Sequence, residues 1–235
     1  MRNLLISAYT IVFAAGMFFL FNSCSKKHDN QEPLVIIPTT NPLPYSVLVY
    51  LITPTDKTFN PDYYRAAKAC IQNLQTWYKA QLGKTFVLNP VVVDTLTGLH
   101  NSTWFEGNNG DSISGTGSIH SYYNTKYELQ QLLGSRFDTA HFIFFAFVAS
   151  DFPDETIPRG LAVEGSPNLD GLLSKFPDAY KGADGHALAH AFGLPEPSVV
   201  NDQAIMSTGW PKYPNCIFTQ DEKDSLSASP FLQSQ

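Results

Sequence analysis

The sequence predicts a mixed α/β domain over residues 45–235, and three observations lead to this prediction. The segment "YSVLVYLIT" at 45–53 is rich in β-branched and aromatic residues, as strands are. The uninterrupted apolar segment "HFIFFAFVA" at 141–149 is typical of a strand buried inside a sheet. Segments with helical spacing lie between the strands, so we expect a mixed sheet covered by helices.

The first helix and the second strand follow from local signals. Asn60 before Pro61 is typical of a helix start, and apolar residues at helical spacing continue to Gly83, where the helix should end. Residues 86–96 predict the second strand. Pro90 indicates a bulge or an edge position in this strand, because proline donates no backbone hydrogen bond.

The later elements are shorter. A loop rich in glycine and serine at 107–118 precedes a predicted helix at 120–133. "GLAVEG" at 160–165 predicts a short strand flanked by glycines, for which we expect the edge of the sheet. Thr219 and Glu222 have the spacing of a capping box and predict the start of a terminal helix.

Composition limits the class of protein. Hydrophobic residues make up 43% of the 235 residues and aromatic residues 13%, as in a globular protein with one ordinary domain. The formal net charge is -6, and the chain has no basic cluster beyond Lys26-Lys27. Nucleic-acid binding through phosphate contacts is therefore not expected.

Residues 1–23 predict a targeting segment. Arg2 precedes an apolar segment at 4–21, and Cys24 follows directly. This resembles a bacterial lipoprotein signal, which implies that Cys24 is acylated and that the protein is lipid-anchored in the cell envelope, in the periplasm or at the cell surface. A plain membrane anchor is the alternative, since the apolar segment could just span a bilayer. Residues 24–44 contain four prolines and are typical of a tether.

Two further cysteines, Cys70 and Cys216, lie within the domain. In an oxidising compartment such a pair can form a disulfide bond, whereas two buried thiols are the alternative.

A pair of histidines carries the strongest functional signal. In "GADGHALAHAFGLPEP" at 182–197, His186 and His190 lie one helical turn apart and share a face, where two imidazoles can hold one zinc ion. Gly193 can adopt the backbone conformation that ends the helix, and Glu196 can then return as an oxygen ligand. A histidine pair at this spacing also occurs by chance on helices with one polar face.

This pattern, followed by Met206, resembles the extended zinc motif and methionine turn of the metzincin (zincin) metallopeptidases. The resemblance implies an α+β zincin-like fold with a twisted mixed sheet of about four to five strands, two main helices, and a small C-terminal subdomain with a terminal helix. It also implies a zinc site of His186, His190 and Glu196 with Met206 packed beneath it. The substrate cleft would follow an edge strand of the sheet.

Three positions depart from the family pattern. Ala187 replaces the glutamate that takes a proton from water, Glu196 stands where histidine or aspartate is usual, and Thr208 stands where a tyrosine is often found. Loss of the general base removes about 10²–10⁴-fold of rate. Asp184 and Glu164 are the carboxylates that could substitute for it.

The sequence therefore predicts an exported, zinc-binding, metzincin-like domain that is a weak or inactive peptidase because of Ala187. The alternative is a non-catalytic module that binds a peptide or protein along the edge strand. Among the remaining residues, His100 and His120 flank the glycine-rich loop and could meet. Trp104 and Phe105 are expected to pack, and the roles of Trp210 and Tyr213 stay open.

Overall fold

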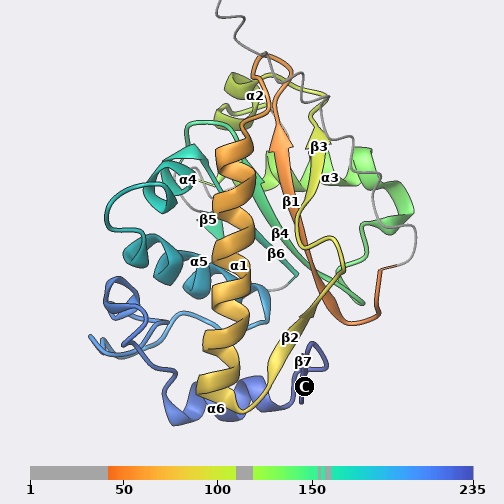
Figure 1. Cartoon of the computed structure of the whole chain (residues 1–235). Coiled ribbons are helices and arrows are strands. Elements are labelled where there is room, and N and C mark those ends of the chain that lie inside the picture. Colours follow the sequence, from red (N-terminus) through yellow and green to blue (C-terminus); the bar gives the residue numbers. More distant parts are fainter. Residues whose placement is uncertain (1–41, 110–118, 153–154, 157–159, 235) are drawn as a thin grey trace, which may run out of the picture. The chain divides into compact units, whose positions relative to one another are not determined.

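The computed structural model describes residues 42–109, 119–152, 155–156 and 160–234. The predicted signal segment, Cys24 and the tether up to residue 41 lie outside the described residues, as does the glycine-rich loop from residue 110 to 118. Figure 1 shows a sheet with a long helix in front of it and shorter helices around it. Among the described residues, no helix combines the length and the apolar content needed to cross a membrane.

One mixed sheet organises the part of the chain that the structure describes. Its strands follow the order β5-β6-β4-β1-β2-β7, and β3 also pairs with β1. The pairs of β1 with β2, β3 and β4 and of β4 with β6 are parallel, whereas β5 and β7 run antiparallel to their neighbours. The strands are β1 (Ser46–Thr53), β2 (Thr85–Leu88), β3 (Asp94–Thr97), β4 (Ile143–Val148), β5 (Glu155–Thr156), β6 (Leu161–Glu164) and β7 (Leu232–Gln233).

The strand predicted at 86–96 is divided into β2 and β3. β2 pairs with the first residues of β1, and β3 pairs with its last four. The interruption contains Pro90, which cannot donate a ladder hydrogen bond. The irregularity predicted at this proline is therefore confirmed.

The prediction that residues 160–165 form the edge of the sheet is wrong. β6 pairs with β4 on one side and, through Ala162 and Val163, with β5 on the other. β5 itself occupies the edge and contains only Glu155 and Thr156. A strand of two residues is too short to show the alternation by which strands are found in a sequence.

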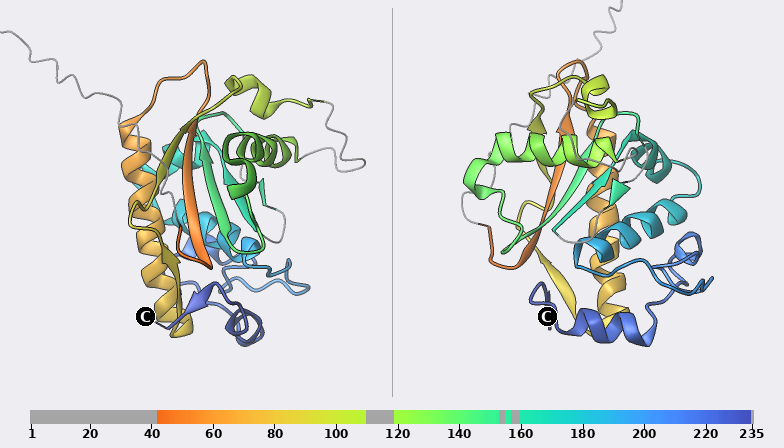
Figure 2. Two further views of the ribbon diagram at one scale, coloured as in Figure 1. Left: turned by 90° about the vertical axis from the view of Figure 1, so that its right-hand side faces the viewer. Right: turned by 180° about the vertical axis from the view of Figure 1, so that it is seen from behind.

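Helices cover both faces of the sheet. Figure 2 shows α1 on one side of the sheet and α3 on the other. α1 begins at the predicted Asn60 cap and ends at Gly83, which has a φ of 67°. The helices are α1 (Pro61–Leu82), α2 (Ser102–Glu106), α3 (His120–Leu133), α4 (Ser166–Leu172), α5 (Asp178–Ala191) and α6 (Gln220–Ser227), with 3₁₀ turns η1 (Gly134–Arg136) and η2 (Trp210–Lys212).

The core has two parts because residues of β1 and β4 alternate between the two faces of the sheet. Val49 and Phe145 belong to the cluster under α1 and α5, whereas Tyr50 and Phe144 belong to the cluster under α3. Both strands are buried along their whole length, as the apolar segment at 141–149 predicts. The α/β fold class is confirmed, and the sheet has more strands than expected because β5 and β7 have only two residues each.

Candidate metal centre

The two histidines of the motif lie one turn apart on α5, with both rings turned to one point. Their Nε2 atoms are 3.0 Å apart, and the ring planes are close to perpendicular, at 88°. The Glu196 Oε1 atom lies 3.0 Å from the Nε2 atom of His190 and 3.7 Å from that of His186. The structure thus brings together all three residues that the sequence predicts as ligands.

Backbone carbonyl groups decide how the two rings are protonated. The Nδ1 atom of His190 lies 2.7 Å from the Leu194 oxygen, and that of His186 lies 2.9 Å from the Ile205 oxygen. A carbonyl oxygen only accepts hydrogen bonds, so each Nδ1 atom carries a hydrogen, and in the neutral form of each ring the Nε2 atom offers its lone pair to the cluster. The second nitrogen of a metal-bound histidine usually donates in this way.

The donor set fits a zinc ion. Each of the three residues offers one ligand atom, and these atoms lie within 4.8 Å of one another. Two nitrogen ligands of a tetrahedral zinc ion are about 3.3 Å apart, since each Zn–N bond is about 2.0–2.1 Å long. The three separations in the cluster are close to that value. Three electron-pair donors at such distances repel one another unless a cation or a shared proton lies between them.

A turn at Gly193 returns the chain from the helix to the cluster. Gly193 has a φ of 107°, a value that residues with a Cβ atom rarely adopt. Its N–H group donates to the His190 oxygen, and the next N–H group, of Leu194, donates to the Ala189 oxygen. Both the Leu194 carbonyl group and Glu196 are placed by this turn, as expected at Gly193.

The three side chains differ in their contact with solvent. His190 is 4% exposed, His186 19% and Glu196 71%. The cluster therefore lies at the surface, with the carboxylate on the open side. A ligand from solvent has access on that side.

The segment around Met206 contacts α5 at two places. Met206 is fully buried, and its neighbour Ile205 supplies the carbonyl group that holds His186. η2, a few residues further on, packs against Gly182 of α5 so closely that a Cβ atom there would lie 1.9 Å from the Trp210 oxygen. Met206 thus belongs to the core on the α1 side of the sheet, next in sequence to the residue that holds His186.

Ala187 lies beside the cluster but offers no proton acceptor. It is 1% exposed and belongs to the core on the α1 side of the sheet. Thr208, the residue at the tyrosine position, is exposed.

The two carboxylates considered as substitutes lie outside the metal-ligand cluster. Asp184 is fully buried, and its Oδ2 atom accepts a hydrogen bond from the Cys70 Sγ atom of α1 at 2.8 Å. Glu164 is also fully buried, at the end of β6. Neither belongs to the group of ligand atoms within 4.8 Å among the described residues.

The predicted disulfide bond between Cys70 and Cys216 is wrong, since both are free and buried thiols. Cys70 is held instead by its contact with Asp184. Burial first, and then the negative charge of Asp184, raises the pKa of Cys70 well above its usual value. Burial raises the pKa of Cys216 to about 11.

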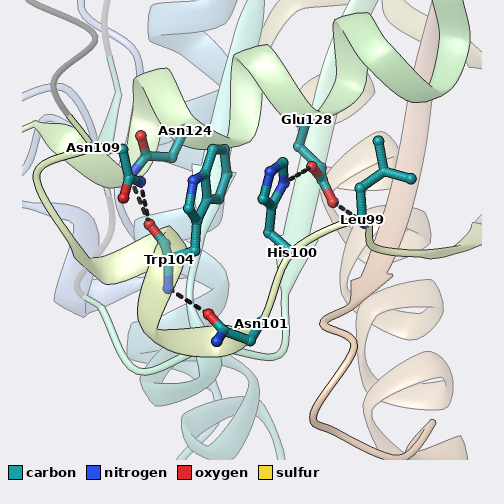
Figure 3. A network of polar contacts seen from close by, with 7 residues as sticks. All are labelled: Leu99, His100, Asn101, Trp104, Asn109, Asn124 and Glu128. Carbon is teal, nitrogen blue, oxygen red and sulfur yellow. Dashed lines mark hydrogen bonds and ion pairs between the residues drawn. The ribbon is translucent and has the colours of Figure 1, made fainter.

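The aromatic residues before the glycine-rich loop build a separate polar network. His100 does not meet His120: its Nδ1 atom contacts the Glu128 Oε2 atom of α3 at 2.7 Å, and its ring stacks on Trp104 at 3.8 Å (Figure 3). Phe105, next to Trp104, is fully buried, as expected. Outside this network, Tyr213 packs against Trp77 of α1. This network ties the loop after β3 to α3 and contributes nothing to the metal-ligand cluster.

Sequence reasoning missed the two carbonyl groups that orient the histidines. Every residue carries a carbonyl group, so the residue types at Leu194 and Ile205 gave no signal. The turn at Gly193 places the Leu194 group, and the backbone hydrogen bond from Ile205 to the Ile217 oxygen fixes the segment that carries the other.

No protein-family model matches the sequence, and no curated protein matches it. Among solved structures, the chain is similar to wild-type OgpA from Akkermansia muciniphila, with 15% identity and a TM-score of 0.58 over 81% of this chain and 62% of that one. It is also similar to catalytically inactive OgpA in complex with an O-glycopeptide substrate, with 13% identity and a TM-score of 0.57 over 79% of this chain and 60% of that one. The chain thus spans about three fifths of the length of these OgpA chains.

Archaemetzincin from Methanopyrus kandleri matches with 10% identity over 80% of this chain and 97% of that one. The TM-score of this match is 0.45. The likeness to OgpA therefore shows that this chain shares the fold of those structures, a mixed sheet with helices on both its faces.

Proposed function

We propose that this protein is an exported zinc-binding domain of the metzincin-like metallopeptidase type, with weak or no peptidase activity. His186, His190 and Glu196 would hold the zinc ion. Ala187 stands where the general base is needed, which is the reason for the low activity.

One observation carries the zinc assignment: two histidine lone pairs and a carboxylate oxygen meet at separations of 3.0–3.7 Å. Backbone carbonyl groups hold both rings in the orientation that a metal requires, so binding would need no rearrangement of His186 or His190. The exposed Glu196 side chain leaves one side of the site open, as catalytic zinc sites do.

The residues of the chain account for the low activity. Zinc, when bound, supplies a Lewis acid that polarises a carbonyl group and promotes the ionisation of water. The proton released in such a reaction needs an acceptor within hydrogen-bond reach, and the methyl group of Ala187 accepts none. Because Asp184 contacts Cys70, its carboxylate does not replace the base. The missing base corresponds to about 2.7–5.4 kcal/mol of barrier.

The ligand that we propose is a peptide or protein. OgpA, which has a similar fold, binds an O-glycopeptide. Among the described residues the edge of the sheet is β5, which pairs with β6 on one side and has no described strand on the other, where a peptide strand could be added. The same observations support the alternative function, a non-catalytic peptide-binding module, and the burial of a methyl group at Ala187 favours it over an efficient enzyme.

The cellular location is a proposal from the N-terminal sequence. A lipid on Cys24 would hold the domain in the bacterial cell envelope, with residues 24–44 as the tether. Palmitate labelling of the full chain and of a Cys24→Ala variant would test this. Equal labelling of both would exclude lipidation at this cysteine.

The metal is tested by mass spectrometry on the full chain, purified without chelators. We expect about one zinc ion per chain, because one three-residue site holds one ion. A His190→Ala variant should lose this zinc. His141→Ala is the matched control, because His141 is an exposed histidine outside the ligand cluster whose side chain contacts the exposed Asp138 and the ring of Tyr45. No zinc in the unaltered chain, even after zinc is added back, would overturn the proposal.

The chemistry is tested with an Ala187→Glu variant. If the site lacks only its base, this single change should raise zinc-dependent peptide cleavage by about 10²–10⁴-fold. Because residue 187 is buried, the zinc content and melting temperature of the variant must first match those of the parent. Strong zinc-dependent cleavage by the unaltered chain would contradict the assignment of low activity.

A further inference from the structure

A cavity of about 550 Å³ lies between the segment after Gly193 and the first two turns of α6. Its size is within the range of small-ligand pockets. Glu196, the proposed oxygen ligand, is part of its wall. The cavity therefore shares Glu196 with the metal-ligand cluster, so a peptide at the cluster has the cavity beside it.

The cavity is lined unevenly. Pro195, Pro197 and Val199 line one side, and Val199 is 72% exposed. The α6 side contributes Asp221 and Glu222. None of the lining residues is a lysine, an arginine or a histidine. Such a space favours a group with an apolar stem and a positive end.

The two α6 carboxylates have different roles. Glu222 belongs to the capping box, where its Oε2 atom accepts a hydrogen bond from the Thr219 N–H group at 2.7 Å. Asp221 is exposed and takes part in α6 only through its backbone oxygen, which accepts from Ser225. Its carboxylate thus stays available to a ligand. Lys212, which reaches Asp202 beside the cavity wall, has its ammonium group paired at 2.6 Å.

We propose that this cavity binds the side chain of a lysine or arginine in a peptide held at the metal centre, with Asp221 as the residue that selects the positive charge. This inference rests on the proposed function and names the class of peptide that it takes. The stem would pack on the two prolines and Val199. Because Asp221 is exposed, its ion pair with the lysine or arginine of the peptide is partly screened by solvent, and the preference for a positive charge is modest.

The test uses the full chain, loaded with zinc, and fluorescent alanine hexapeptides blocked at both ends. Each peptide carries one lysine, one norleucine or one glutamate, placed at every position in turn. Norleucine has the apolar stem without the charge. At one position we expect lysine to bind about five-fold more tightly than norleucine, measured by fluorescence anisotropy at low salt. The preference should shrink at high salt.

Two variants assign the preference to the cavity. Asp221→Asn should reduce the lysine preference at that position to near one-fold and leave norleucine binding unchanged. Asp224→Asn is the matched control, because Asp224 is an exposed carboxylate of the same helix outside this cavity. Ser225→Phe, which fills the cavity, should weaken both peptides.

The outcomes separate this inference from the proposed function. Equal binding of lysine and norleucine peptides at every position, no peptide binding at all, or a lysine preference that Asp221→Asn leaves intact would each overturn the cavity assignment, whatever the zinc content. Absence of zinc would overturn the metal centre. A lysine preference that Asp221→Asn abolishes would support the cavity even in that case.

Discussion

The Nε2 atoms of His186 and His190 lie 3.0 Å apart, while a backbone oxygen holds the Nδ1 atom of each ring. Neither ring can turn away without losing a hydrogen bond. When both rings are neutral, the arrangement keeps two Nε2 lone pairs in close contact, which is unfavourable unless a positive charge lies between them. This relationship leads to the first two predictions.

Replacing Glu196 with glutamine should weaken zinc binding by at least about ten-fold, because the site loses its charged oxygen ligand. Since this side chain is 71% exposed, the metal-free protein should keep its stability. Competition with a chelating dye measures the zinc affinity. Asp202→Asn is the control, because Asp202 is an equally exposed carboxylate, at 70%, outside the cluster. Equal zinc affinity of both variants would exclude Glu196 as a ligand.

Gly193→Ala should lower both stability and zinc affinity. The φ of 107° would cost an alanine about 1–2 kcal/mol, and relief of that strain would displace the Leu194 carbonyl group and Glu196. Gly83→Ala, at a φ of 67° with open space around it, has a comparable backbone penalty far from the cluster. Urea unfolding should show similar losses for the two variants, but only Gly193→Ala should lose zinc affinity. Unchanged zinc affinity in Gly193→Ala would show that this turn does not position the ligands.

Gly182→Ala should destabilise the protein by about 2–3 kcal/mol, because an added methyl group would overlap the Trp210 oxygen. Alanine is the better helix former, so helix propensity alone predicts the opposite sign. Equilibrium unfolding in urea decides between the two. A stability equal to or above that of the parent would show that η2 does not pack tightly on α5.

His100→Ala should destabilise the fold by about 1–3 kcal/mol without changing zinc content. Glu128 is fully buried, and without His100 its carboxylate keeps the hydrogen bond from the Leu99 N–H group but loses its side-chain partner (Figure 3). A second substitution, Glu128→Gln, should restore part of the loss. In the control His141→Ala, the paired Asp138 is exposed and the expected loss is small. Equal losses in the two histidine variants would contradict a special role for Glu128.

Cys70 and Cys216 should resist alkylation in the native state and react on unfolding, as mapped by mass spectrometry. Burial raises both pKa values above the usual range, so the folded state keeps the thiols protonated while the unfolded chain ionises above about pH 9. The stability is thus fully present below that pH and decreases as the pH rises toward 11. The unaltered protein should therefore lose stability between about pH 8 and about pH 10.5, the range in which the unfolded thiols ionise. A free energy of unfolding that stays constant over this range would contradict the direction of the two pKa shifts. Native alkylation of either cysteine at pH 8 would do the same.

Much of the fold could be predicted because local signals decide it. The Asn60-Pro61 start of α1, the capping box of α6 and the apolar run of β4 each depend on residues close together in the chain. The edge strand was placed wrongly because β5 has two residues and becomes a strand only through pairing with β6. The disulfide bond was predicted wrongly because a sequence does not show that Cys70 is held by Asp184 across two helices.

The sequence by itself determined the three possible metal ligands, the turn at Gly193 and the absence of a base at Ala187, because helical spacing and residue chemistry are local properties. Only the tertiary structure decided the orientation of the two rings, since carbonyl groups of Leu194 and Ile205 hold their Nδ1 atoms from outside the helix. It also decided that Asp184 contacts α1, and that Glu196 belongs both to the ligand cluster and to a cavity beside α6. These relationships join residues from separate elements, and packing alone brings those elements together.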